Sequence, residues 1–164
     1  MALEGEDDPQ VVARNLRIVL DDFAPGDELA DLHQVHGAEV DLVEERTSTA
    51  RPDADGIVTG RPGVVLMVRA ADCVPVLLAD ADAAVIGAAH CGRPGLAAGV
   101  VPATVDRMRA LGARSITAWI GPHVCGACYE VPESMQADVG AAVPASVATT
   151  SWGTASLDLG AGVR

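Results

Sequence analysis

The chain contains no lysine, so all 11 of its basic residues are arginines, against 23 acidic residues. The formal net charge of −12 at pH 7 disfavours binding to polyanions and to anionic membrane surfaces. We therefore expect neither a nucleic acid nor a membrane as a partner. A small anion remains compatible with this charge, because a few arginines and backbone N–H groups are enough to bind one.

Aromatic residues and long apolar runs are also scarce. One Phe, one Tyr and two Trp leave few ring faces for stacking on bases or sugars. No apolar run approaches the ~20 residues that span a bilayer, and the acidic start MALEGEDDPQ lacks the apolar region of a signal peptide. These absences predict a cytoplasmic protein. In that compartment the four cysteines are expected to be free, metal-bound or reactive rather than paired in disulfides.

The 164 residues predict one domain with its own core. Asp8 followed by Pro9 is typical of a helix start, and apolar residues at helical spacing predict a helix over residues 9–23. Alternation of polar and apolar residues predicts a strand over 39–43. Short apolar runs predict further strands over residues 57–59, 64–68, 74–78, 84–89, 115–120 and 155–159, with no helix after the last. Strands that are apolar on both faces lie in a covered sheet, so the fold class is a layered α/β domain rich in strands.

A second helical pattern extends over residues 96–111. Gly112 is a suitable residue to end this helix. Pro102 lies inside the pattern, and a proline at that place either kinks the helix or marks its start.

The most informative residues are His36 in HQVHG, Cys73 in ADCVPVLL and His90 in AAHCG. Two imidazoles and one thiolate make a plausible set of three metal ligands. The residues are 37 and 17 positions apart, too far for a local zinc finger, so the fold must bring them together. Structural zinc takes four protein ligands, whereas a catalytic site has three and an open position. We interpret the three residues as a site of the catalytic kind.

Each ligand candidate also has an ordinary interpretation. His36 alone could be a surface histidine, although Gly37 permits a left-handed turn that would present it. Cys73 precedes an apolar strand and could be a small core residue. Its neighbour Asp72 could orient a ligand or accept a hydrogen bond from a nearby backbone N–H.

His90 ends an apolar strand, and the loop Cys91-Gly92-Arg93-Pro94-Gly95 follows it. Backbone N–H groups of a glycine-rich loop that leads into a helix favour an anion, with Arg93 as a helper. The alternative is that the loop is only a turn.

Cys125 and Cys128 form a CxxC pair. A zinc ribbon needs a second such pair, and thioredoxin-like chemistry needs the pair at a helix start. Residues 129–132 instead look like the end of a strand. We interpret the pair as incidental, with His123 and Cys125 as a weak second metal candidate.

Taken together, six stretches of the sequence resemble, in order, the laccase-domain family. Its members were first called multicopper polyphenol oxidases and are now regarded as zinc-dependent purine nucleoside phosphorylases with adenosine deaminase activity. The matching stretches are GEDDPQVVARNLRIVL, HQVHGAEV, ADGIVTGRPGVVLMVRAADCVPVLL, AAHCGRPGLAAGVV, IGPHVCGACYEV and SLDL, which cover nearly all of residues 5–159.

The resemblance implies both a metal site and a fold. The family's ligands are the second His of QVHG, the Cys of ADC and the His of AHxG, which correspond to His36, Cys73 and His90. The implied fold is a layered α/β/β/α domain of mixed sheets, related at a distance to toxin deamidases that use a Cys–His pair.

The chain departs from the family pattern in its loops and in its length. Members usually read AHAGWRG, so Arg93 and Pro94 replace the usual Trp and Arg, and the usual LDLWxANR is LDLGAG here. Members also have about a further third of sequence in an N-terminal sheet segment and a C-terminal stretch. We expect residues 1–164 to be a single laccase-like domain that lacks both segments. Sheet edges left uncovered in this way would favour a homo-oligomer.

The first hypothesis for function is therefore a zinc enzyme that acts on purine nucleosides, by phosphorolysis (a transferase reaction) or by deamination (a hydrolase reaction). Zinc on His36, Cys73 and His90 would lower the pKa of water for attack on adenine. Phosphate would be placed against the ribose by an anion site. The residues proposed for substrate and phosphate are Arg69, Asp72, Gly92 and Arg93.

Three alternatives remain at this stage. The second hypothesis is a shortened relative that binds metal or nucleoside without turnover. The third is a metal-free hydrolase or deamidase, with Cys73 as the nucleophile and His90 as its base. The last is a copper oxidase, but a laccase needs a trinuclear cluster with many more imidazoles than the four His present, so copper is disfavoured.

Overall fold

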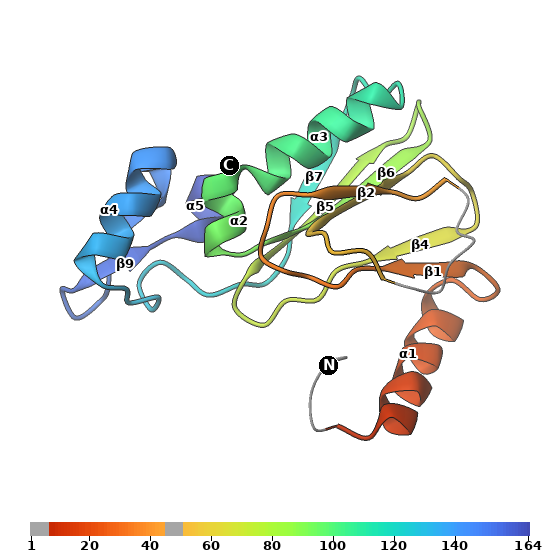
Figure 1. Cartoon of the computed structure of the whole chain (residues 1–164), viewed down its shortest axis with the longest axis horizontal. Coiled ribbons are helices and arrows are strands. Elements are labelled where there is room, and N and C mark those ends of the chain that lie inside the picture. Colours follow the sequence, from red (N-terminus) through yellow and green to blue (C-terminus); the bar gives the residue numbers. More distant parts are fainter. Residues whose placement is uncertain (1–6, 45–50) are drawn as a thin grey trace.

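The protein has a layered mixed α/β architecture in the computed structural model, which describes residues 7–44 and 51–164 (Figure 1). A helix, a two-stranded parallel sheet, a five-stranded mixed sheet and a pair of helices lie one above another. The first layer is α1 (Pro9–Phe23), and the two-stranded sheet consists of β1 (Glu28–Asp31) and β4 (Val64–Met67). The pair of helices on the other side of the five-stranded sheet is α2 (Arg93–Ala98) and α3 (Val100–Ala110). The predicted α/β/β/α class is confirmed.

The five-stranded sheet has the strand order β2-β3-β6-β5-β7. Its strands are β2 (Val40–Leu42), β3 (Gly56–Thr59), β5 (Val74–Asp80), β6 (Val85–Cys91) and β7 (Thr117–Ile120). β2 and β3 are parallel, and the other neighbours are antiparallel. The bounds of all five strands fall within two residues of the ranges predicted from alternation (β2) and from apolar runs (the other four).

The two faces of this sheet pack against different layers. Ile57 and Ala88 belong to the buried cluster shared with β1 and β4, whereas their chain neighbours Val58 and Ala89 belong to the cluster shared with α3. Alternation of side chains along a strand explains this split. The predicted two-sided burial is therefore confirmed for β3 and β6.

On β5 and β7 the face that points away from α3 is bare. Leu77 and Trp119 are paired across these strands, and their side chains are 51% and 54% exposed. The two-stranded sheet covers the neighbouring strands but does not reach this pair. The sheet is therefore covered on both sides only over part of its width.

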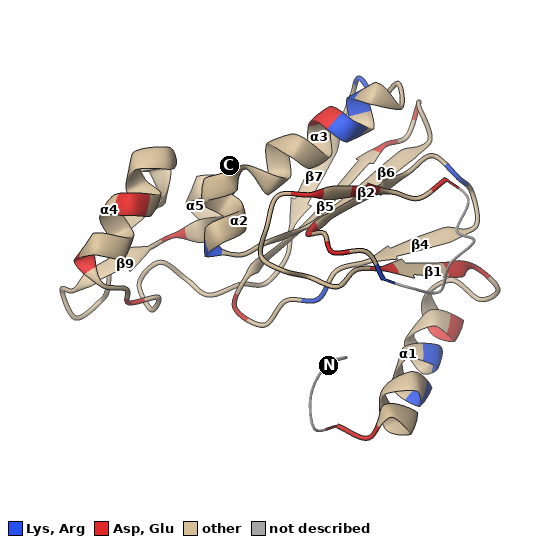
Figure 2. Cartoon of the chain, in the orientation of Figure 1, with Lys and Arg blue, Asp and Glu red and all other residues tan. Residues whose placement is uncertain are grey.

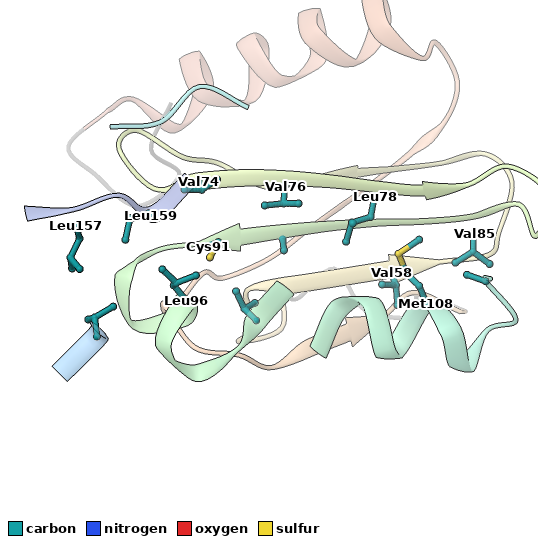
Figure 3. Close-up of a cluster of buried hydrophobic side chains, with 14 of the residues drawn as sticks. Val58, Val74, Val76, Leu78, Val85, Cys91, Leu96, Met108, Leu157 and Leu159 are labelled. Atoms are coloured by element: carbon teal, nitrogen blue, oxygen red, sulfur yellow. The ribbon is translucent and has the colours of Figure 1, made fainter. Parts of the chain in front are cut away.

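The main core lies between the five-stranded sheet and the helices (Figure 3). Met108 of α3 packs beside Val58, and both are fully buried. At the other end of the cluster, Cys91 lies near Leu96 of α2. Aliphatic side chains of moderate size fill this core, as the scarcity of aromatic residues requires.

Helix α1 begins as predicted. The Asp8 carboxylate accepts a hydrogen bond from Gln10 N (2.8 Å), and Pro9 occupies the first helical position. Only Val12 of this helix is buried, whereas the apolar side chains of Val11, Ile18 and Phe23 are more than half exposed.

The second predicted helix is divided at a residue other than Pro102. Gly99 adopts a left-handed conformation (φ 84°) between α2 and α3. Glycine adopts this conformation without the steric cost that a Cβ would add. Pro102 lies in the first turn of α3, where a missing N–H costs no helical hydrogen bond. Gly112 follows the end of α3 with φ 100°, as predicted.

The C-terminal part contains elements that the sequence analysis did not predict. They are α4 (Glu133–Ala142), the 3-10 turn η1 (Pro144–Ser146), β8 (Val147–Thr149) and α5 (Leu159–Val163). Strand β9 (Ala155–Leu157) pairs with β8. The strand predicted over 155–159 is confirmed over Ala155–Leu157. The expectation that no helix follows it was wrong, because Asp158 caps α5 by accepting from Ala161 N (2.7 Å). In the predicted strand end 129–132, only Glu130 forms an isolated bridge, to Ser156.

Charged residues are dispersed over the fold rather than gathered on one element (Figure 2). The described arginines lie on α1, at the start of α2, on α3 and in several loops (Figure 2). Among the described residues, no helix has both the length and the apolar character to cross a membrane.

Candidate metal centre

The three candidate ligands lie together although they come from different parts of the chain. His36 lies between β1 and β2, Cys73 directly before β5, and His90 in β6. Their ligand atoms all lie within 4.8 Å of one another. His36 is exposed, Cys73 half-buried and His90 buried. The cluster therefore opens to solvent on the His36 side.

His36 itself, rather than Gly37, adopts the left-handed conformation (φ 60°). The sequence analysis assigned the turn to the glycine, and this detail was wrong. A residue with a Cβ pays a conformational cost of about 1–2 kcal/mol there. The N–H groups on either side compensate, because Val35 N and Gly37 N donate to Asp55 Oδ2 (3.1 and 2.6 Å). The Asp55 carboxylate thus fixes the turn that presents His36.

The same carboxylate also positions His90. Asp55 Oδ1 lies 2.8 Å from His90 Nδ1, and the side chain of Asp55 is fully buried. The backbone N–H of His90 donates to Asp55 O (2.7 Å). A carboxylate acceptor places the proton on Nδ1, which leaves Nε2 as the acceptor nitrogen that a metal ion needs.

Asp55 was missed by the sequence analysis. The only signal was a carboxylate placed directly before a wholly apolar strand, in DADGIV. The three segments that it joins are distant in sequence, so its role becomes visible only in the fold.

Gly92 allows the ligands to approach the start of α2. A Cβ at this position would lie 2.7 Å from His36 Cδ2 and 3.0 Å from Cys73 Sγ. The predicted involvement of Gly92 therefore has a steric basis: the backbone lies against the two ligand side chains.

Burial and negative charge act on the thiols. Burial, with the carboxylates of Asp72 and Asp55, raises the pKa of Cys73. Burial raises the pKa of the neighbouring Cys91 to about 12. A cysteine nucleophile needs a lowered pKa. The raised pKa of Cys73 therefore does not favour the metal-free hydrolase.

A pocket of about 470 Å³ adjoins the cluster. All three ligand candidates line it, together with Asp72 and Arg69. This volume falls within the range of small-molecule sites.

The two arginines proposed for an anion differ in position. Arg69 lines the pocket, and its guanidinium donates to Asp31 Oδ2 and to Leu32 O (both 3.0 Å). A guanidinium has five N–H donors, so these bonds leave others for an anion. Arg93 is the first residue of α2 and is not among the described residues that line the pocket.

A histidine–carboxylate pair also lies at the pocket and was not predicted. His33 Nδ1 lies 2.6 Å from Asp53 Oδ1, and His33 lines the pocket. Gln34, also in the lining, accepts from Arg69 N (2.8 Å) and donates to Arg69 O (2.7 Å). These contacts fix the relative positions of the two pocket walls.

The donor set fits a metal ion. Two imidazole nitrogens and one thiolate suit zinc or copper, with zinc favoured for a tetrahedral site that keeps one open position. Among the described residues, this is the one group of three or more potential ligands that lie close together. The second candidate pair, His123 and Cys125, is not part of such a group.

The whole chain, residues 1–164, matches the family model described as multi-copper polyphenol oxidoreductase laccase. A purine nucleoside phosphorylase of Streptomyces griseus is 54% identical over 137 residues, which are 81% of this chain and 56% of that protein. A purine nucleoside phosphorylase of Mycobacterium tuberculosis is 46% identical over 161 residues, which are 97% of this chain and 64% of that protein. The chain thus spans less than two thirds of the length of these relatives.

Solved structures resemble the fold over the whole chain. YlmD from Geobacillus stearothermophilus superposes with a TM-score of 0.84 at 29% identity, covering 100% of this chain and 70% of that one. Protein NMB0706 of Neisseria meningitidis, described as a DUF152 protein, gives a TM-score of 0.84 at 29% identity, covering 99% of this chain and 67% of that one. By sequence and by fold, the chain belongs to the multi-copper polyphenol oxidoreductase laccase family.

Proposed function

We propose that this chain is a zinc-dependent purine nucleoside phosphorylase that also deaminates adenosine. The observation that supports this most is the convergence of His36, Cys73 and His90 at the mouth of a pocket of about 470 Å³. Relatives at 54% and 46% identity bear the name purine nucleoside phosphorylase. A purine nucleoside and phosphate are the corresponding substrates.

His36, Cys73 and His90 would bind the zinc ion, which supplies Lewis-acid catalysis when bound. Asp55 keeps the proton on His90 Nδ1, so that Nε2 stays available. Gly92 leaves room on the α2 side of the cluster, where a side chain would collide with two ligands. Asp55 and Gly92 thus shape the site without being ligands themselves.

The pocket residues of the chain would orient the substrates. Phosphorolysis depends mainly on placing phosphate against the anomeric carbon of the ribose and on stabilising charge. Arg69, half-buried in the pocket wall, is placed to bind phosphate, and Arg51 lines the same pocket. Asp72 lies beside Cys73 in the same lining and is placed to accept a hydrogen bond from the nucleoside.

Product analysis tests the proposal. Protein freed of metal and reloaded with zinc would be incubated with adenosine, inosine or guanosine, with and without phosphate, and the products separated by chromatography. We expect phosphate-dependent release of the free base and phosphate-independent conversion of adenosine to inosine. Unchanged nucleosides in all reactions, with zinc still bound, would refute the proposal and favour a binding relative without turnover.

A pair of cysteine variants assigns the activity to the cluster. Cys73→Ala removes a proposed ligand, and we expect it to abolish zinc binding and turnover. Cys125→Ala is the matched control, because Cys125 is exposed and lies outside the cluster. Full activity of Cys73→Ala would remove this residue from the site, and an intense blue colour with copper would instead indicate a copper–thiolate centre.

A further inference from the structure

Cys125 and Cys128 lie at the surface with their sulfurs 2.9 Å apart. Both side chains are exposed, whereas Cys91 is buried and Cys73 half-buried. Free thiols in such close contact are an arrangement that neither the core nor the proposed metal site requires. The sequence analysis treated this pair as incidental.

The backbone between the two cysteines is a tight turn. Cys128 N and Tyr129 N both donate to Cys125 O (3.0 and 3.1 Å). A turn closed in this way has its first and fourth Cα atoms less than about 7 Å apart. Disulfides join Cα atoms about 4.4–6.8 Å apart, so the backbone can accept a bond between these sulfurs.

The turn is also anchored to the β8–β9 hairpin. Ser151 N donates to Ala127 O (3.0 Å), and the Ser156 hydroxyl donates to Gly126 O. Both central residues of the turn are thus fixed by their carbonyl groups. The cysteines therefore meet in a preformed geometry rather than by chance encounter of a loose loop.

We propose that Cys125 and Cys128 form a reversible thiol–disulfide couple that reacts with low-molecular-weight disulfides. One cysteine thiolate attacks the small disulfide, forms a mixed disulfide and releases one small thiol. The second cysteine, as its thiolate, attacks the protein sulfur of the mixed disulfide and releases the second small thiol. Two protein thiols are oxidised to one disulfide, and one small disulfide is reduced to two thiols.

The cysteine couple is linked to the segment that carries Cys73, so its position bears on the oxidation of the candidate metal site. Val124, directly before the turn, donates its N–H to Asp72 O (3.0 Å), next to Cys73. Both cysteines of the couple are exposed, whereas Cys73 in this part of the fold is half-buried. Thiol–disulfide exchange needs access of the small disulfide to the sulfur, so the exposed couple takes up the oxidant before Cys73 does.

Peptide mapping of the intact protein tests the couple. The protein would be equilibrated with mixtures of reduced and oxidised glutathione, alkylated and digested with trypsin. Residues 115–164 form one tryptic peptide, because no arginine lies between Arg114 and Arg164. Its only cysteines are Cys125 and Cys128. We expect this peptide to lose two hydrogens and to resist alkylation, while the peptide with Cys73 is still alkylated. Treatment with dithiothreitol should restore both thiols.

Two single variants distinguish a disulfide from separate adducts. Cys125→Ser and Cys128→Ser cannot close the ring and should stop at the glutathione mixed disulfide. The wild-type pair should be half oxidised at an oxidised-glutathione concentration at least about tenfold lower than either variant needs, because the second thiol acts intramolecularly. If the wild-type peptide stays fully alkylated, or collects glutathione without closing, the couple does not exist. Oxidation of Cys73 before the pair would overturn the order that we propose.

Discussion

The Asp55 carboxylate bonds to the segments that carry both candidate histidine ligands. One oxygen of its carboxylate lies by His90 Nδ1, and the other accepts the two N–H groups that flank His36. This single side chain therefore sets the orientation of one ligand and the backbone of another. Its conservative replacement is the sharpest test of the site at the scale of one residue.

We predict that Asp55→Asn weakens zinc binding by about 10–100-fold, the range seen when a partner of a metal-ligating histidine is changed. The Asn oxygen can still accept the turn N–H groups, but its amide then donates to His90 Nδ1 and moves the ring proton to Nε2. Competition with a chromophoric chelator measures the affinity, and nitrogen-15 chemical shifts of His90 in the metal-free protein report the tautomer.

Asp53→Asn serves as the matched control, since Asp53 pairs with His33 at the pocket but contacts no candidate ligand in the described interactions. Its zinc affinity should remain close to wild type. An unchanged affinity and tautomer in Asp55→Asn would show that the carboxylate only stabilises the fold.

Asp80 gives a prediction for pH dependence. Four backbone N–H groups donate to its carboxylate, those of Asp82, Ala83, Arg114 and Ser115, and these bonds lower its pKa from 3.8 to about 2. Because the pKa is lower in the folded state, the unfolded state binds more protons between these values, so stability rises with pH there. The contribution is complete above about pH 4 and is lost as the pH falls through about 2.

We predict that Asp80→Asn is less stable than wild type at neutral pH and that the difference shrinks as the pH falls from about 4 to about 2. Urea unfolding of both proteins across this range measures it. Asp82→Asn is the control, because Asp82 is exposed and takes part in this network through its backbone. A difference between wild type and Asp80→Asn that stays constant down to pH 2 would contradict the assignment.

At the scale of elements, the start of α2 is defined by how closely it approaches the ligands. A Cβ at Gly92 would collide with His36 and Cys73, whereas a Cβ at Gly60 would meet only Val85 Cγ2 at 3.9 Å. We predict that Gly92→Ala lowers zinc affinity at least about tenfold, by displacing ligands that must meet at fixed bond lengths. Isothermal titration with zinc compares it with Gly60→Ala, which should bind as wild type; equal binding by both would disprove the steric role.

The two faces of β5 provide a matched test of the layers. Val76 is fully buried on the face toward the helices, while its neighbour Leu77 is half exposed on the opposite face. We predict that Val76→Ala costs about 2 kcal/mol of unfolding free energy and Leu77→Ala less than about 1 kcal/mol. Chemical denaturation measures both, and an equal or larger loss for Leu77→Ala would mean that this face is covered in solution.

The sequence predicted those elements whose signals are local. The helix at residues 9–23 was found because its cap, proline and apolar spacing are adjacent. Strand β2 was found from its alternation of polar and apolar residues, and the other strands of the central sheet from their apolar runs. β1 was missed because only Ala30 of its four residues is buried, so no pattern is left to recognise. The break at Gly99 was assigned to Pro102, since the sequence does not reveal which residue will adopt a left-handed conformation.

The sequence likewise predicted only part of the candidate site. Three residues with suitable side chains were identified, and the structure brings them together within 4.8 Å. Their roles as ligands stay a prediction until metal binding is measured. Asp55, His33 and Gln34 were missed because polar groups that act through other residues have no spacing of their own.

At the scale of the whole molecule, two apolar surfaces are exposed: the face of β5 and β7 that points away from α3, and helix α1. Both expose large apolar side chains, Leu77 and Trp119 on the sheet and Ile18 and Phe23 on the helix. The chain spans 56% and 64% of the relatives named above. The larger buried core lies between the five-stranded sheet and α2–α3.

The three candidate ligands lie on three separate segments, and this spacing links metal binding to folding. An ion bound only by the assembled site adds to the free energy of unfolding, by about 2.7 kcal/mol when free zinc is a hundred times its dissociation constant. The melting temperature should therefore rise with zinc concentration, with no such rise in Cys73→Ala or with magnesium. Melting curves that do not move with zinc would mean that the assembled site does not bind it.

If the site binds zinc, removal of the zinc by a chelator would destabilise the whole sheet, since His90 lies in its central strand. The availability of zinc would thus set how much folded protein persists, independently of any reaction it performs.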